Sequence, residues 1–263
     1  MRFTGLFGFS PAALLRAALL ATICIALFAP LSACGKKGPV RPKVARQVEA
    51  PTDVTLQQQG NLFVLAWTIP ADKQQGSVED LTGFVIKRLT YDATDGCPTC
   101  RTPENQVAEL SIKDPTPGQR IGDRIYWRDF DIRADTGYRY AIVPVTLGNI
   151  EAPFATIHLA AQQPPPAPGN LQAEAGNGQV SLQWEPPALT AGMELLGYNL
   201  YRRQAKRPFP IVPVNAKPLM KTSLLDRGLA NGRAYEYRVS ALVASGSQQL
   251  ESMASPGVVV TPR

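Results

Sequence analysis

The chain has 263 residues, of which 44% are hydrophobic and 18% charged, so it is long enough for two small domains and too apolar to be disordered throughout. The net charge of +6 lies outside the predicted folded part, because Pro51 to Arg263 holds 20 basic and 20 acidic residues. A nucleic-acid-binding fold carries its basic excess on a folded face, so this distribution argues against a nucleic-acid partner. His158 is the only histidine, which excludes a histidine-based metal cluster within one chain.

The first 33 residues have the features of a secretory signal peptide. Arg2 and Arg16 come before an apolar run from Ala17 to Leu31, and small residues follow it. A membrane-spanning helix needs about 20 apolar residues, and this run is shorter. The sequence therefore predicts an export signal rather than a membrane span.

The end of this signal carries a more specific pattern. Leu31-Ser32-Ala33-Cys34 resembles the lipobox of bacterial lipoproteins. The resemblance implies cleavage before Cys34, a diacylglyceryl thioether on its sulfur and an acyl group on its amine. Because each buried methylene contributes about 0.8 kcal/mol, such chains would anchor the protein to a membrane. The alternative is a plain signal peptide cut after Ala33, with Cys34 left as a free thiol.

Residues 34–50 form a predicted basic tether, acylated at its first residue. Gly35 follows Cys34, and by the sorting rule of Gram-negative lipoproteins this implies an outer-membrane destination, facing the periplasm or the outside. Cys34 to Pro39 also resembles the start of small outer-membrane lipoproteins, some of which attach to the lipopolysaccharide translocon. Val40 and Arg41 depart from that family. The simpler interpretation is a solvated tether near anionic head groups.

The rest of the chain contains an internal repeat. Pro51 to Trp67 aligns without a gap with Pro168 to Trp184. Apolar residues alternate with a period of two at the ends of both segments, which predicts strands with one buried face. These positions are Phe63, Leu65 and Trp67 in the first copy and Val180, Leu182 and Trp184 in the second.

The alignment continues through three further segments. Leu81 to Arg88 matches Leu195 to Arg202, and Asp129 to Tyr140 matches Asp226 to Tyr237. A last strand pairs Pro153 to Ile157 with Pro256 to Val260. The sequence thus predicts two all-β units at residues 51–161 and 169–263. The proline-rich segment 162–168 between them favours an extended, semi-rigid spacer.

The two units resemble fibronectin type III domains. The resemblance depends on Trp184, on Gly197-Tyr198-x-x-Tyr201-Arg202 and on Leu229-x-Asn231-Gly232-x-x-Tyr235-x-Tyr237. It implies tandem immunoglobulin-like sandwiches with a tyrosine corner, and we expect these aromatic rings to point into the core. Fold resemblance does not carry function, and our main hypothesis is a non-catalytic outer-membrane lipoprotein without cofactors that binds a protein or glycan of the cell envelope.

The first copy is 17 residues longer than the second between its Gly83 and Asp129. The extra residues include Cys97-Pro98-Thr99-Cys100, and the exposed loops from Leu89 to Gly122 are the best candidates for partner contact. In an oxidising compartment we expect Cys97 and Cys100 to form a structural disulfide. A thiol-disulfide oxidoreductase and a metal site are the alternatives, and both lack supporting features: no helical pattern follows the cysteines, and no histidine accompanies them.

Three polar residues and the opposite net charges of the two units lead to further expectations. We expect His158 to face solvent, and Asp129 and Asp226, which recur before the tyrosine corner, to accept turn or backbone hydrogen bonds. Residues 51–161 carry a net charge of −4 and residues 162–263 a net charge of +4. This difference suggests electrostatic docking of the two units, or head-to-tail contact between molecules.

Overall fold

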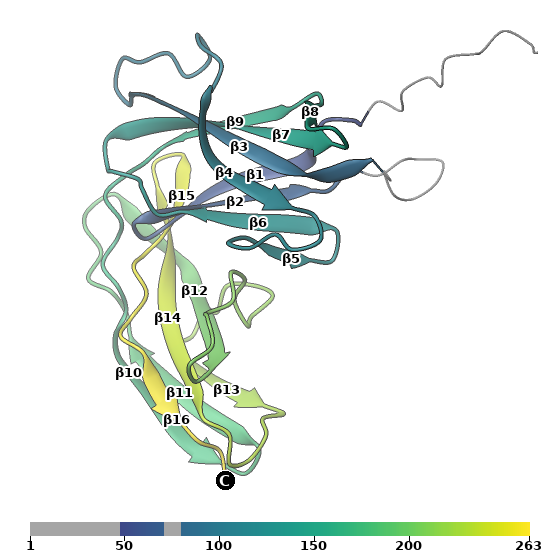
Figure 1. The fold of residues 1–263 in the computed structure, drawn as a ribbon. Coiled ribbons are helices and arrows are strands. Elements are labelled where there is room, and N and C mark those ends of the chain that lie inside the picture. The colour runs from purple at the N-terminus through teal and green to yellow at the C-terminus, as the bar shows by residue number, and fades with distance from the viewer. Residues whose placement is uncertain (1–47, 71–79) are drawn as a thin grey trace, which may run out of the picture. The chain divides into compact units, whose positions relative to one another are not determined.

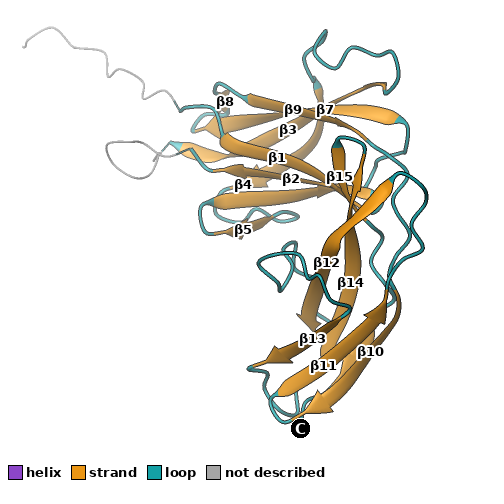
Figure 2. Cartoon of the chain, turned by 180° about the vertical axis from the view of Figure 1, so that it is seen from behind, coloured by secondary structure: helices purple, strands orange, loops and turns teal. Residues whose placement is uncertain are grey.

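The computed structural model describes residues 48–70 and 80–263 (Figure 1). The predicted signal peptide, Cys34 and nearly all of the tether lie outside the described residues. Every regular element in the described ranges is a strand, as Figure 2 shows, so the all-β prediction is confirmed. Among these residues, no helix is long and apolar enough to cross a bilayer. Gln47–Arg263 forms one compact unit.

The first β-sandwich contains nine strands. They are β1 (Thr52–Gln59), β2 (Leu62–Thr68), β3 (Leu81–Asp92), β4 (Asn105–Ser111), β5 (Gln119–Ile121), β6 (Arg124–Asp129), β7 (Thr136–Thr146), β8 (Ile150–Glu151) and β9 (Ala155–Ala160). One sheet has the order β1-β2-β6-β5, and the other has the order β4-β3-β7-β8 with β9 also on β7. Their inner faces enclose a core in which Phe63, Leu65 and Trp67 are fully buried, as the alternation predicts.

The second sandwich contains seven strands. They are β10 (Gly169–Gly176), β11 (Gln179–Glu185), β12 (Met193–Gln204), β13 (Ser223–Arg227), β14 (Tyr235–Ser245), β15 (Gln248–Glu251) and β16 (Val258–Val260). The sheet β10-β11-β13 faces the sheet formed by β12, β14, β15 and β16. Val180, Leu182 and Trp184 are buried as predicted, and the Trp184 ring lies edge-on to the Tyr198 ring with centroids 5.4 Å apart.

A tyrosine corner is present in both sandwiches, which confirms the resemblance at this point. The hydroxyl of Tyr235 accepts a hydrogen bond from the backbone N–H of Ala230 at 3.2 Å. In the first sandwich the hydroxyl of Tyr138 accepts one from Arg133 at 2.8 Å. Each corner fixes the chain where it enters the long strand β14 or β7, and both rings are buried.

The prediction that all repeat tyrosines point into the core is wrong for Tyr201. Tyr198 and Leu200 on β12 lie in the core of the second sandwich, and Tyr201 lies on the opposite face of the same strand. Its side chain is nevertheless buried, at 7% exposure. The physical reason is that the first sandwich covers this outer face, as described below.

The prediction of a long exposed loop from Leu89 to Gly122 is also partly wrong. β3 continues to Asp92, and β4 pairs antiparallel with β3, so much of the extra length adds strands to the first sandwich. Leu110 on β4 is fully buried because its side chain joins the core. Gly83 permits this pairing, since a Cβ there would lie 2.3 Å from the carbonyl oxygen of Leu110. The loop proper is confined to residues 93–104, and a second irregular segment joins β4 to β5.

Candidate functional site

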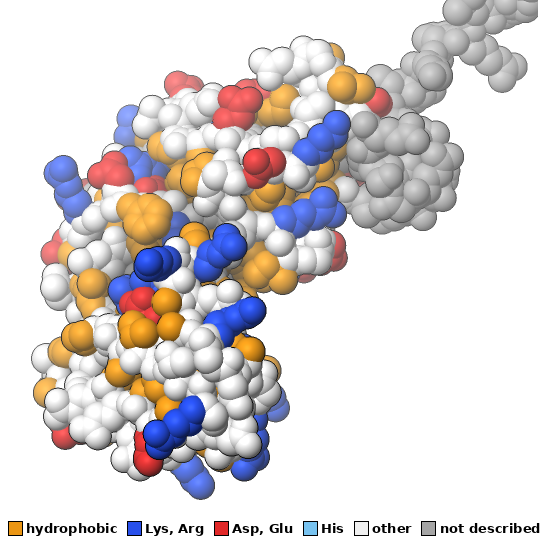
Figure 3. All heavy atoms as spheres, turned by 60° about the horizontal axis from the view of Figure 1, so that its bottom comes forward, with side chains coloured by type: hydrophobic (Ala, Val, Ile, Leu, Met, Phe, Trp, Pro, Cys, Tyr) orange, Lys and Arg blue, Asp and Glu red, His pale blue; other side chains and the backbone are white. Residues whose placement is uncertain are grey.

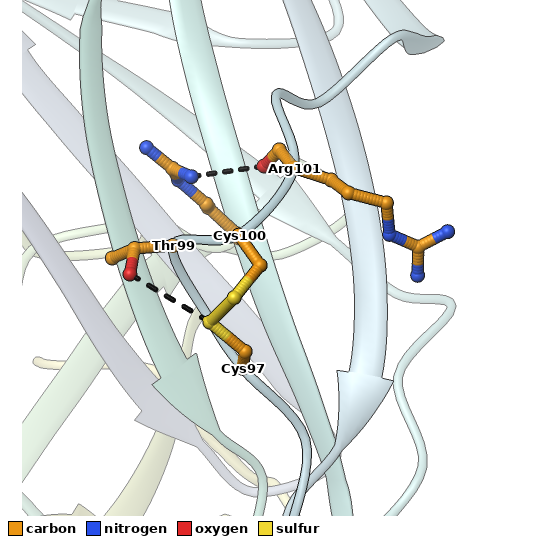
Figure 4. Close-up of a disulfide and its surroundings, with 5 residues drawn as sticks. Cys97, Thr99, Cys100 and Arg101 are labelled. Carbon is orange, nitrogen blue, oxygen red and sulfur yellow. Dashed lines mark hydrogen bonds between the residues drawn. A yellow bond between two sulfur atoms is a disulfide. The ribbon is translucent and has the colours of Figure 1, made fainter.

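The cysteine loop lies between β3 and β4 on the first sandwich. Cys97 and Cys100 are both exposed and are joined by a disulfide with their Cα atoms 5.5 Å apart (Figure 4). The Thr99 hydroxyl lies 3.9 Å from the sulfur of Cys97, and Arg139 of β7 donates to the backbone carbonyl of Arg101 at 2.9 Å. The bond from Arg139 ties the loop to β7.

The local turn before the cysteines is built on Asp92. Its carboxylate accepts hydrogen bonds from the backbone N–H of Thr94 at 2.8 Å and of Asp95 at 3.3 Å, and these bonds lower the pKa of Asp92 below its ordinary value. After Cys100 the chain runs into β4 and not into a helix. A redox-active pair usually takes its low thiol pKa from a helix N-terminus, so this loop lacks the feature that such chemistry requires.

His158 lies on β9, opposite Arg139 on β7, and is exposed to solvent as expected. Within the described residues, no group of three or more histidine, cysteine or acidic side chains is arranged to hold a metal ion.

A buried charged cluster, missed in the sequence analysis, lies at the end of β6. Asp129 is 4% exposed, and its Oδ2 accepts hydrogen bonds from Arg88 and from the Tyr140 hydroxyl, both at 2.7 Å. Its Oδ1 accepts the backbone N–H of Asp131 at 2.9 Å, which is the backbone bond that the sequence predicts. Burial and the neighbouring Asp129 carboxylate raise the pKa of Tyr140 far above its ordinary value, so the phenol stays protonated.

The second sandwich repeats this cluster. Arg202 donates to both carboxylate oxygens of Asp226, at 2.8 and 2.6 Å, and the Tyr237 hydroxyl donates to Oδ2 at 2.7 Å. The expected backbone bond is therefore replaced by side-chain partners at Asp226. Asp226 and Tyr237 are buried, Arg202 is partly exposed, and the three groups satisfy one another, which is typical of a structural ion pair and not of a general acid or base. The sequence signal was available, because the arginine, aspartate and tyrosine recur at the same positions of the repeat.

The two sandwiches are joined through an edge strand. β15, which continues the β14 hairpin of the second sandwich, pairs in parallel with β1 of the first: Gln58 aligns with Leu250 and Gln59 with Glu251. The backbone N–H of Gly60 donates to the carbonyl of Glu251 at 2.9 Å. This pairing covers the free edge of β1, which would otherwise expose unpaired backbone groups.

A glutamine clamp reinforces the joint. Gln58 is 2% exposed, and its amide donates to the carbonyl oxygens of Gly60 at 3.0 Å and Gln162 at 2.6 Å. Its own carbonyl accepts the backbone N–H of Gln162 at 2.9 Å. Gln162 in turn donates from its side chain to Gln248 at 2.8 Å. The predicted spacer therefore starts as part of the joint, and its Pro165 and Pro168 are buried.

A third group of contacts surrounds Tyr201. Its hydroxyl donates to Glu251 at 2.8 Å and accepts a hydrogen bond from the amide of Gln59 on β1. Ser240 donates to the same carboxylate oxygen. Burial and the Glu251 carboxylate raise the pKa of Tyr201 well above its ordinary value. Within the described residues every ion pair lies inside one sandwich, so hydrogen bonds and strand pairing make this joint.

Known proteins resemble part of this chain in sequence. Residues 166–256 match the family model of the fibronectin type III domain. The cardiac-type myosin-binding protein C of Mus musculus is 32% identical over 90 residues, which are 34% of this chain and 7% of that protein. Human neogenin is 28% identical over 100 residues, and an alpha-amylase of Niallia circulans 35% identical over 99 residues, each match covering 37% of this chain and 7% of the other. The chain thus spans about 7% of the length of these relatives.

Among solved structures, the chicken CNTN1 FN1-FN3 domains match 82% of this chain and 68% of their own, with 16% identity and a TM-score of 0.33. The sequence match and the sandwich architecture together show an immunoglobulin-like fold with a fibronectin type III domain in its second half. Domains of this type serve non-catalytic binding or scaffolding, and the partner is not specified by the fold.

Proposed function

We propose that this protein is a non-catalytic lipoprotein of the outer membrane. Lipid on Cys34 holds it, the basic tether spaces it from the bilayer, and the two sandwiches bind a protein or glycan partner, most simply in the periplasm. The fibronectin type III match at residues 166–256 carries the binding role. The lipobox-like sequence ending at Cys34 supports the anchor.

The joint between the sandwiches supports a scaffolding role. Strand pairing, the Gln58 clamp and the Tyr201 contacts hold both halves in one unit, so surfaces from both can face one partner at a fixed spacing. Preorganisation of this kind lowers the ordering cost of binding. The buried Arg–Asp–Tyr clusters stabilise each half and leave no free acid or base for catalysis at those positions.

The anchor is tested by replacing its acceptor. In cells that carry the full-length Cys34→Ala variant, we expect the protein to leave the membrane fraction. The matched control, Cys97→Ser with Cys100→Ser, should stay in that fraction because it keeps the acylated residue. Mass spectrometry of the native mature N-terminus should find acyl chains on Cys34. An unmodified cysteine at that position would contradict the anchored placement.

A second candidate role is assembly of the lipopolysaccharide translocon through Cys34 to Pro39. The motif in the sequence is its sole support. A shortened chain that ends at Ala50 discriminates the two roles: if it restores the phenotype of a deletion strain, the sandwiches are dispensable and the binding role fails. We do not propose thiol-disulfide exchange, because the Cys97–Cys100 loop runs into a strand and lacks a helix N-terminus.

A further inference from the structure

A cleft of about 400 Å³ opens at the joint between the sandwiches. Its walls come from the β1–β2 turn, the end of β6, the strand β14 and the segment that follows β15. Its lining residues include Arg128, Phe130, Phe209, Arg238, Glu251 and Met253. Figure 3 shows basic side chains beside hydrophobic ones in the middle of this face. The volume falls in the range of ligand pockets, which is about 300–1,000 Å³.

The apolar part of the lining is unusually accessible. Phe130 is 72% exposed and Met253 is 42% exposed. Phe209 is half-buried, and the guanidinium carbons of Arg203 and Arg238 lie 4.3 and 4.6 Å from the centroid of its ring. This stacking holds the Phe209 ring in place, so the cleft offers preformed apolar walls.

The charged part of the lining has an excess of positive charge. Arg128 donates to the backbone carbonyl of Pro210 at 3.0 Å. Burial lowers the pKa of Arg128, and the nearby oxygens of Tyr201 and Glu251 offset this effect only in part. Arg238 shares the carboxylate of Glu236 with Arg203. The Arg238 side chain is 41% exposed, whereas the Nε atoms of Arg128 and Arg238 are themselves buried and have no hydrogen-bond partner among the described residues.

The one acidic residue of the lining cannot balance these arginines. Glu251 is 9% exposed, and its Oε1 already accepts hydrogen bonds from Tyr201 and Ser240. A sugar donates from its hydroxyl groups to acceptors, and Oε1 of this carboxylate is already occupied by two donors. The cleft instead presents donors beside apolar surface, which suits an anion attached to an apolar group.

We infer that this cleft binds a peptide segment of a partner protein in which an aspartate or glutamate side chain stands next to apolar side chains. The carboxylate would lie against the Arg238 and Arg128 guanidinium groups, and the apolar neighbours would pack on Phe130 and Met253. The inference rests on the proposed binding function and specifies the chemistry of the partner.

The methionines allow a direct test on the full-length chain in detergent. Met253 lines the cleft, Met220 is 74% exposed elsewhere, and Met193 packs against the second core. With methyl-labelled methionine, NMR titrations compare acetyl-Phe-Glu-Leu-amide with the matched peptide that carries glutamine in place of glutamate. We expect the glutamate peptide to shift the Met253 signal, and not that of Met220, at a concentration about tenfold lower than the glutamine peptide.

Two variants locate the effect. Arg238→Gln should remove the preference for glutamate, and the control Arg227→Gln, an exposed arginine of the same sandwich, should keep it. The Met193 signal reports whether each variant is folded. If Arg238→Gln does not fold, Phe130→Ala replaces it, since that exposed side chain contributes little to the core. Phe130→Ala should weaken both peptides.

Three outcomes would overturn the inference: equal response to both peptides, a Met220 shift as large as that of Met253, or a Met253 shift produced by chitotetraose and not by the glutamate peptide. The third would assign the cleft to glycans. Failure of the Cys34 test with an intact peptide response would instead reject the anchored placement and leave the cleft assignment standing.

Discussion

The two copies of the repeat use one pair of equivalent positions in opposite ways. In the first sandwich Lys87 on β3 pairs with Glu151 on β8 at 2.7 Å, and the Glu151 side chain is 53% exposed. In the second, Tyr201 on β12 bonds Glu251 on β15 in a buried place. The ladder register confirms the equivalence, because Val145 aligns with Glu151 and Leu242 with Glu251.

The difference shows that the environment of a sheet face decides what its residues do. An exposed lysine–glutamate pair adds little stability because water screens it. In the second copy the other sandwich covers these two positions. Tyr201 there donates to the buried Glu251 carboxylate from a neutral hydroxyl, which loses less hydration on burial than a charged lysine would. The adjacent positions also differ between the copies: Arg238 and Ser240 on β14 line the cleft, and their counterparts Ala141 and Val143 on β7 are apolar and buried.

The largest expected difference between the copies concerns the buried clusters. Asp129→Ala removes the buried carboxylate that Arg88 and Tyr140 share. Arg88, whose side chain is 12% exposed, then keeps only its bonds to the exposed Asp131, and we expect a loss of about 3–5 kcal/mol in the free energy of unfolding. Asp226→Ala should cost less, about 2–3 kcal/mol, because the Arg202 side chain is 32% exposed and water can solvate it. Urea unfolding followed by tryptophan fluorescence measures both, and equal losses would contradict the argument.

Alkaline pH should weaken both copies together. Burial, followed by the neighbouring carboxylates, raises the pKa of Tyr140, Tyr201 and Tyr237 above the ordinary value of 10.0. The folded chain then keeps protons that the unfolded chain has released, so stability is unaffected below about pH 10 and falls above it. The expected slope is about 1.4 kcal/mol per pH unit for each tyrosine. Urea titrations at pH 8 to 11 measure it, and Tyr140→Phe or Tyr237→Phe should reduce the slope.

The disulfide loop exists only in the first copy and provides a local contrast. Replacing both Cys97 and Cys100 by serine should lower the free energy of unfolding by about 2 kcal/mol or less, because the closed loop is short. Chemical denaturation of the variant in oxidising buffer tests this value, with reduced wild-type protein as the control. A loss well beyond this range would mean that the disulfide positions more of the first sandwich than its own loop.

The smallest effects test the comparison of equivalent positions directly. Tyr201→Phe should cost about 1–2 kcal/mol, because Glu251 and Gln59 both lose a buried partner. Lys87→Met at the equivalent place should change stability by about 0.5 kcal/mol or less. Thermal unfolding of the two variants tests this comparison. The comparison fails if Lys87→Met lowers stability more than Tyr201→Phe.

Much of the fold could be predicted because the buried positions of its strands follow a short-range period in the sequence. The period of two at Phe63 to Trp67 and at Val180 to Trp184 gives both inner faces, and the repeat locates the tyrosine corners. The Arg–Asp–Tyr clusters were also within reach, since all three residue types recur in register in both copies. The cysteine loop was placed by its length difference, although its flanks form more strand than the sequence suggested.

The alternation of apolar residues was thus enough to predict two β units and their cores, because burial on a strand follows alternation. Only the tertiary structure decided that Gln58, Gln59 and Tyr201 are buried and that a cleft with two arginines lies beside them. These residues stand on strand faces and edges whose local pattern is that of solvent-exposed positions. Gln58 bonds Gln162, 104 residues away, and Gln59 bonds Tyr201, 142 residues away, and no local period encodes a pairing over that distance.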